Sequence, residues 1–503
     1  MPTFRRALTA LALVVVSVAV AAGAALAVDR IGIGPSAIVP LAAAIVVAGT
    51  YWRWPAEGLL AFGTFSLVAD TLEHWLQLDV LLFDEIGLLL LGGVALTAGH
   101  LALARVRLGW LEGAILVLAI AGILSSVING VPIVTWVAGL FLLLKGVAFF
   151  ELVRFMRLTS ADAERMGIVM LLVAGIIGGL GFLEWFDQPA FQAAFRLPLH
   201  EQIRGEVPVI RSIFLHPAQY GWLTAYASLL CYAVVITRRS WWALPAGLLF
   251  NLGTFVSGRR TPLLGVGAAV AIGLAWWSAR LGWRRALVRL WAPVAVLAIV
   301  GLLVAAPSFQ RLAEVTIEEY VPSLDYAGEI LATAPRADVI AAVHPRVALY
   351  AGSAAIARDS FPLGGGLGRF GSHLSREDYS PLYTRYGLDQ IRLLQPGDPQ
   401  AATDAFWPMV LGETGLIGAV AALVLFVGMA VVLWKAASAD GSRRNRMIAL
   451  AALLVVVEGL IRSATSSVYV APPIGYFVLG TAGVALAATS TPEPAGTEDA
   501  GAD

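Results

Sequence analysis

Two adjacent arginines stand in a short turn between two apolar runs, within the sequence Ser257 to Gly265. Arg259 and Arg260 closely precede Pro262, a residue typical of the first turn of a helix, so we expect the pair at a helix N-terminus. Such a terminus favours anions, and arginine binds phosphate oxygens with two parallel hydrogen bonds. The pattern predicts a clamp for a phosphate or diphosphate; the alternative is a pair that binds lipid headgroups.

An arginine and an aspartate flank a glycine-rich loop further along the chain. Arg346 follows Pro345 at the start of a predicted helix, and Asp404 immediately precedes a long apolar run. Asp404 is a candidate general base or positioning group, or else a helix N-terminal residue stabilised by the helix dipole. Arg346 is a candidate catalytic cation, or else an ordinary basic residue of a solvated helix. A nucleotide fingerprint at the glycine-rich run 364–368 would need a preceding strand and a following helix, and the outer face is normally poor in nucleotides, so we expect a close-packed loop.

Several other polar residues favour structural interpretations. Glu413 lies within a predicted span and is expected to be structural, and Lys145 is expected to extend its ammonium group toward the membrane surface. The histidines outside the predicted spans do not have the spacing of metal ligands, and we expect surface side chains at His216, His344 and His373. The absence of an outer Asp-x-Asp pair and the single cysteine, Cys231, indicate neither a bound metal nor a disulfide.

These candidates must be positioned by a membrane domain. Hydrophobic residues make up 59% of the 503 residues and charged residues 14%, with a mean hydropathy of +0.80. So few charges cannot cover a soluble surface, so the composition predicts an all-α polytopic membrane protein and excludes a disordered chain or an ordinary cytosolic enzyme. The net charge of zero argues against nucleic acid as a partner.

A helix that crosses the membrane needs about 20 apolar residues. The first apolar run resembles a signal peptide but is longer than a typical signal core, which favours an uncleaved anchor. The sequence predicts about fourteen spans, at approximately 7–28, 33–51, 56–72, 80–102, 110–129, 132–153, 167–186, 217–237, 241–257, 261–278, 287–306, 407–434, 447–466 and 470–488.

Arginines orient these spans. With the N-terminus inside, every predicted inner loop is basic and the short outer turns carry almost no cations. Both termini are then cytoplasmic, and two long segments, 187–216 and 307–405, lie outside. The Arg259–Arg260 turn also falls outside, against the charge rule, which is often a sign of function.

The predicted organisation has four parts. They are N-terminal transmembrane helices at 1–209, a core at 210–434 that includes the large outer loop 307–405, C-terminal transmembrane helices at 435–488, and a disordered acidic tail at 489–503.

Three motifs, in this order, resemble the O-antigen ligase and polymerase family of bacterial envelope glycosyltransferases. Ser257–Gly265 is similar to the Ser-Arg turn of that family, with Arg260 on its arginine. Arg346 with Pro362–Phe370 is similar to the arginine helix and Pro-x-Gly-x-Gly-x-Gly loop of the large outer segment. Asp404–Gly418 resembles the segment that re-enters the membrane.

The resemblance implies a donor oligosaccharide on undecaprenyl diphosphate, a glycan or lipid acceptor, and transfer at the outer face of the bacterial cytoplasmic membrane without metal, nucleotide or other cofactor. Asp404 and Arg346 would be catalytic, and the donor would bind to Arg259 and Arg260, with the further outer arginines Arg211 and Arg369. Ligases of the family carry a His-Asn pair where this chain has Asp404 and Ala405, which favours a polymerase; peptidoglycan polymerases of the same superfold use an outer aspartate.

Two other classes of function compete with this interpretation. A lipid-linked oligosaccharide flippase is compatible with fourteen spans, but it would place charged residues along its spans and would have short loops on both faces. A non-catalytic envelope scaffold would not explain the outer arginine pair. The dominant outer loop and the scarcity of charges within the spans favour the enzyme.

Overall fold

The computed structural model describes residues 35–77, 83–101, 109–198, 203–204, 207–238, 240, 242–281 and 343–490. The predicted spans 7–28 and 287–306, the first part of the large outer loop (307–342) and the tail after residue 490 lie outside these residues.

The described residues form an α-helical protein, with one antiparallel ladder between the two-residue strands β1 (Ile203–Arg204) and β2 (Val207–Pro208). The longer helices are α2 (Pro35–Arg53), α3 (Pro55–Leu76), α4 (Phe83–Thr97), α5 (Trp110–Ile128), α6 (Ile133–Arg154), α7 (Ser160–Phe186), α9 (Pro217–Arg238), α10 (Ala243–Val256), α11 (Arg260–Leu281), α15 (Pro345–Asp359), α18 (Phe406–Ser438), α19 (Arg443–Arg462) and α20 (Ile474–Ser490). The short ones are α8 (Gln188–Ala194), α16 (His373–Glu377), α17 (Pro381–Arg385), η3 (Leu388–Gln390) and η4 (Gln400–Thr403).

Each predicted span that falls on described residues coincides with a helix. Within this part of the chain, six helices are long and apolar enough to cross a membrane, namely α5, α6, α7, α9, α11 and α18. The all-α class is therefore confirmed and the chain is a multi-pass membrane protein, whereas the total of about fourteen spans stays a prediction.

Local sequence signals explain where several helices begin. Thr159 and Asp162 form a capping box at the start of α7, in which each side chain accepts a hydrogen bond from the other residue's backbone N–H. Pro55 and Pro345 occupy the first turns of α3 and α15, where the missing N–H of proline has no cost. Large side chains of one helix pack on small residues of another and bring the helices together. For example, Phe149 of α6 packs directly on Gly480 of α20.

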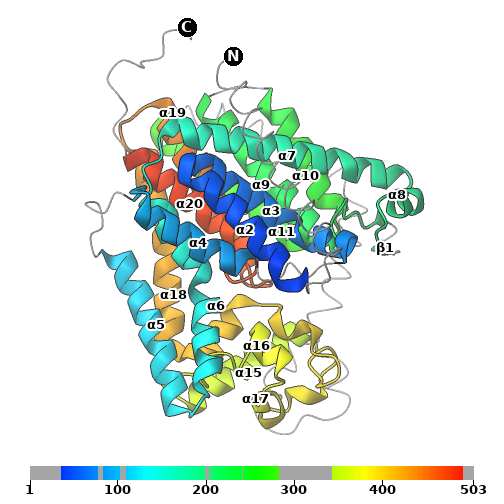
Figure 1. Cartoon of the computed structure of the whole chain (residues 1–503), viewed down its shortest axis with the longest axis vertical. Coiled ribbons are helices and arrows are strands. Elements are labelled where there is room, and N and C mark those ends of the chain that lie inside the picture. Colours follow the sequence, from blue (N-terminus) through cyan, green and yellow to red (C-terminus); the bar gives the residue numbers. More distant parts are fainter. Residues whose placement is uncertain are drawn as a thin grey trace.

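Figure 1 shows α5 and α18 side by side, with α15, α16 and α17 grouped at one end of the molecule. Residues 343–405 are folded there around a small core of their own. It is separate from the main core of the helix bundle and consists of Val343, Ala348, Leu349, Ile356, Phe370, Leu382, Tyr383, Leu388, Ile391, Leu394, Ala401 and Ala402.

Helix ends predicted to share a membrane face do meet. Glu164, near the start of α7, pairs with Arg238 at the end of α9 (2.6 Å) and with Arg444 at the start of α19 (2.8 Å). Arg165 pairs with Glu57 at the start of α3 (2.9 Å). We call this the basic end of the bundle. The other end carries residues 343–405, and we call it the loop end.

One prediction about charge is wrong. Lys145 does not extend to the membrane surface: its side chain is 5% exposed, and its ammonium group lies 2.9 Å from Asp84 and 2.6 Å from Glu85 of α4. Tyr476 of α20 donates a hydrogen bond to the same Asp84 carboxylate (3.1 Å). Four charged or polar side chains from three helices thus satisfy one another inside the bundle. The bundle is consequently richer in internal charges than the sequence indicated.

Candidate functional site

The two residues predicted to be catalytic are in direct contact. Nη2 of Arg346 lies 3.0 Å from Oδ2 of Asp404, although 58 residues separate them in the chain. Their side chains are 25% and 39% exposed, so the pair faces solvent rather than the core. A hydrogen bond between two charged groups is stronger than one between neutral groups, and it fixes the orientation of both side chains.

The ends of two helices position this pair. Arg346 lies in the first turn of α15, where Nδ1 of His344 accepts a hydrogen bond from the Arg346 backbone (3.1 Å). Asp404 directly follows η4 and stands two residues before α18. His344 is therefore a helix cap and not simply the exposed side chain that its sequence context indicated.

Both helices rest on the segment that connects α19 to α20. The backbone N–H of Phe406 donates to the carbonyl of Ser463 (3.3 Å), and the indole of Trp407 donates to the Ser463 hydroxyl (2.8 Å). Tyr350, one helical turn after Arg346, donates to the carbonyl of Ala464 (2.8 Å). Partial burial raises the pKa of Tyr350 to about 12, so this hydroxyl remains a donor at neutral pH.

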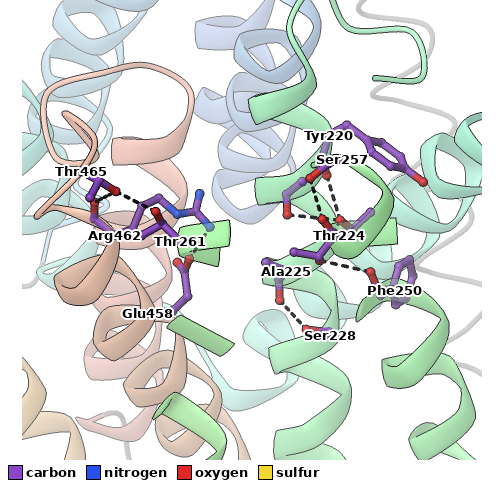
Figure 2. Close-up of polar contacts among 12 residues, drawn as sticks. Tyr220, Thr224, Ala225, Ser228, Phe250, Ser257, Thr261, Glu458, Arg462 and Thr465 are labelled. Carbon is purple, nitrogen blue, oxygen red and sulfur yellow. Dashed lines mark hydrogen bonds and ion pairs between the residues drawn. The ribbon is translucent and has the colours of Figure 1, made fainter. Parts of the chain in front are cut away.

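The Arg259–Arg260 turn approaches the same connecting segment. As predicted, the pair lies at a helix N-terminus, because α11 begins at Arg260. The hydroxyl of Thr465 donates to that of Thr261 in the first turn of α11 (2.9 Å), as Figure 2 shows. Residues 463–465 thus contact α11 beside the arginine turn on one side and α15 beside the Arg346–Asp404 pair on the other.

A buried network of hydroxyl groups holds the arginine turn. The Ser257 hydroxyl donates to the carbonyl of Thr254 (2.6 Å), and the hydroxyls of Thr254 and Thr224 are 3.0 Å apart. A Cβ at Gly221 of α9 would collide with the Ser257 hydroxyl, so α9 approaches the turn closely. The guanidinium of Arg259 lies 3.2 Å from Nε2 of His216, the residue that precedes α9.

An ion pair that sequence reasoning did not single out lies next to this turn. Arg462, the last residue of α19, pairs with Glu458 one turn earlier, and the side chains of both are only 4% exposed. Figure 2 shows the pair reaching from α19 toward Thr261. The spacing Glu-x-x-x-Arg inside an apolar run was the available signal, because such residues face each other on a helix.

The glycine-rich loop is close-packed, as the sequence predicted. Its backbone N–H groups at Gly365 and Gly366 donate to the carbonyls of Gly412 and Glu413 at the start of α18 (2.7 and 3.1 Å). A Cβ at Gly364 would lie 2.5 Å from the Gly412 oxygen, so only glycine fits there. The Glu413 carboxylate is buried and accepts a hydrogen bond from the backbone of Phe370 (3.1 Å), which agrees with its expected structural role.

Two further arginines, Arg369 and Arg211, were predicted to bind the donor. Arg369 lies half-buried on the glycine-rich loop, and none of the contacts that the structure describes joins it to Arg346 or Asp404. Arg211 is buried; its guanidinium donates to the carbonyls of Pro198 and Leu215, and its backbone N–H donates to Glu184 (2.9 Å). We therefore leave Arg211 out of the candidate site.

His373 stands on α16 with its ring 3.0 Å from Glu377, and both side chains are exposed. Partial desolvation and the nearby Arg376 lower the pKa of His373, while Glu377 opposes that shift. Among the described residues, no three His, Cys, Asp or Glu side chains gather closely enough to hold a metal ion.

The chain was also compared with known proteins. No protein-family model matches it. No curated protein has a significantly similar sequence. The resemblance of its three motifs to the O-antigen ligase and polymerase family therefore stays a prediction.

Proposed function

We propose that the protein is a membrane glycosyltransferase that transfers or polymerises oligosaccharide from an undecaprenyl-diphosphate donor at the outer face of the bacterial cytoplasmic membrane. The contact between Arg346 and Asp404 carries this proposal. Glycosyl transfer from a lipid diphosphate needs cations where the diphosphate leaves and a carboxylate where the acceptor hydroxyl attacks. This solvent-facing pair supplies one of each, beside the segment that also contacts the arginine turn.

In the proposed reaction the acceptor hydroxyl attacks the anomeric carbon of the donor. The bond from that carbon to the diphosphate oxygen breaks, and the hydroxyl proton passes to Asp404. The lipid diphosphate leaves with its new negative charge stabilised by Arg259, Arg260 and Arg346. A single displacement of this kind inverts the configuration of the anomeric carbon.

The ion pair has a function in this scheme before the donor binds. Arg346 holds the Asp404 carboxylate in a fixed orientation. When the diphosphate arrives, its oxygens compete for the guanidinium of Arg346, and the carboxylate is released to accept a proton. Donor binding would thereby activate the base.

The direct test is turnover of a lipid-diphosphate oligosaccharide by the purified protein in vesicles, with the products separated by chain length. A ladder of lengthened glycans would identify a polymerase. A single transfer to an added acceptor would identify a ligase. Folded protein that gives neither product with any lipid-diphosphate oligosaccharide would contradict the proposal.

The side of the membrane can be tested separately. We expect an Asp378→Cys protein to react in intact cells with an impermeant thiol reagent, because Asp378 is exposed on the folded outer loop. The native Cys231 is buried and gives a low background. Ser372 in the same loop is a poor labelling position because it is buried. Reaction only after lysis would place the loop in the cytoplasm.

A second candidate, a lipid-linked oligosaccharide flippase, gains support from one observation. The bundle contains buried ionic groups at Lys145 with Asp84 and Glu85, and at Glu458 with Arg462. Charged groups inside membrane helices often mark a transport pathway. Translocation of a fluorescent lipid-linked oligosaccharide across vesicles, without a change in glycan length, would favour this candidate over the enzyme.

A further inference from the structure

A cavity of about 260 Å³ lies within the helix bundle, between α3, α6, α7, α9, α19 and α20. Nearly all of its wall is apolar, with side chains such as Leu60, Met170 and Phe477. The hydroxyls of Tyr226 and Thr481, which also line it, bond to each other (2.9 Å). The middle of the cavity therefore favours an apolar ligand.

Charged residues stand at one end of this cavity. Glu164 and Arg238 both line it and form an ion pair, and Arg444 binds the other oxygen of the same carboxylate. Two guanidinium groups thus share one carboxylate, so these three side chains together carry one positive charge; Arg165 of the same end lies outside this group and pairs with Glu57 and Asp162. Trp242 lines the same end and is exposed, as is typical of an aromatic residue at a membrane–water boundary.

This charged end lies far from the candidate catalytic site. Arg238 ends α9, whereas His216, the neighbour of Arg259, immediately precedes it. The 22 residues of α9 span about 33 Å at 1.5 Å per residue. Because one headgroup cannot occupy both ends of α9, a headgroup at the charged end of the cavity would not be the diphosphate of the proposed donor.

We propose that the cavity binds one acyl chain of an anionic phospholipid, whose phosphate lies against Arg238 and Arg444. The apolar wall accepts the chain, and the excess positive charge selects a lipid of net negative charge. This inference does not depend on the glycosyltransferase proposal, because none of the residues that carry it belongs to the candidate catalytic site.

Two glycines of α7 provide a matched test. Gly167 lines the cavity and Gly175 does not, and a Cβ added at either position meets no atom within 4 Å. The probe is a phosphatidylglycerol with a photoreactive acyl chain, and labelled peptides are read by mass spectrometry. Because the new side chain would occupy the space of the acyl chain, we expect Gly167→Leu to reduce labelling of α9 and α20 about tenfold or more. Gly175→Leu should label like the unmodified protein, and undiminished labelling of Gly167→Leu would overturn the proposal.

A comparison of lipids in the unmodified protein tests the charged end, whatever Gly167→Leu does to folding. Phosphatidylglycerol should label these helices more strongly than phosphatidylcholine with the same photoreactive chain, and high salt should reduce the difference. Equal labelling by the two lipids would overturn the assignment of the phosphate to Arg238 and Arg444. Displacement of the label by polyprenyl diphosphate at equal or lower concentration would assign the cavity to the donor instead.

Discussion

Two groups of paired charges in this protein differ in their surroundings. Lys145 and Asp84 are buried inside the bundle, with side chains 5% and 9% exposed, whereas Arg346 and Asp404 are 25% and 39% exposed at the loop end. A buried pair whose partner is removed leaves an uncompensated charge that costs about 3–5 kcal/mol. An exposed pair contributes only about 0–1 kcal/mol. The difference indicates that Lys145 contributes to the stability of the fold, whereas the pair of Arg346 and Asp404 contributes little to it.

The largest effect is expected at Asp404. Asp404→Asn keeps the shape of the side chain but removes its basicity, so we expect turnover to fall about 10²–10⁴-fold. The unfolding temperature should change little, because the pair is exposed, and donor binding should be retained or strengthened, because the diphosphate no longer competes with the Asp404 charge for Arg346. Kinetics of the purified variant check this, with Asp378→Asn, another aspartate of the outer loop, as the control. Unchanged turnover in the Asp404 variant would leave the aspartate as a helix-end residue.

Lys145 should show the opposite pattern. Lys145→Met leaves Asp84 and Glu85 without their cation, so we expect a loss of about 3–5 kcal/mol in stability. Thermal unfolding in detergent measures it. Lys435, the only other lysine in the chain, is exposed, and Lys435→Met should be nearly neutral. If the two variants unfold at the same temperature, the cluster of Lys145, Asp84 and Glu85 does not stabilise the fold as expected.

At the arginine turn, the expected effect is on the donor. Arg260→Lys keeps the charge but loses the planar two-bond contact. We expect donor efficiency, kcat/KM, to fall about 10- to 100-fold, since hydrogen bonds to charged groups contribute about 1.5–3 kcal/mol. Arg260→Ala should lose more. Arg443→Ala, an exposed arginine at the basic end, serves as the control. Full turnover by Arg260→Ala at low donor concentration would reject the clamp.

The smallest effect concerns pH. The pKa of His373 is lowered from 6.5 in the folded protein, so the folded protein binds this proton less tightly than the unfolded chain does. The unfolded chain then binds more protons, and this group reduces stability as the pH falls below about 6.5. Glu377→Gln removes the charge that opposes the shift, so it should lower the pKa of His373 further. The pH dependence of His373 modification by diethyl pyrocarbonate checks this; a pKa that rises in the variant would contradict the assigned causes.

Much of the fold could be predicted because it depends on patterns within single helices. Apolar runs located α5, α6, α7 and α18, and Pro262 and Pro345 indicated the starts of α11 and α15. Such patterns could not predict the core of residues 343–405, because its apolar residues are scattered among short helices and turns. The error at Lys145 has the same origin: its partners on α4 precede it by 60 and 61 residues.

Composition and hydrophobic runs dictate where a chain can cross a membrane, so the amino-acid sequence alone indicated which residue types stand near the ends of helices. It also marked Arg260, Arg346 and Asp404 as unusual. The contact between Arg346 and Asp404 became evident only in the folded protein. The same is true of the contacts that residues 463–465 make with both α11 and α15. The tertiary structure likewise shows that the guanidinium of Arg211 donates hydrogen bonds to backbone carbonyls. These outcomes depend on how helices distant in the chain pack together. No periodic pattern in the sequence identifies which distant side chain will be the partner in such a contact.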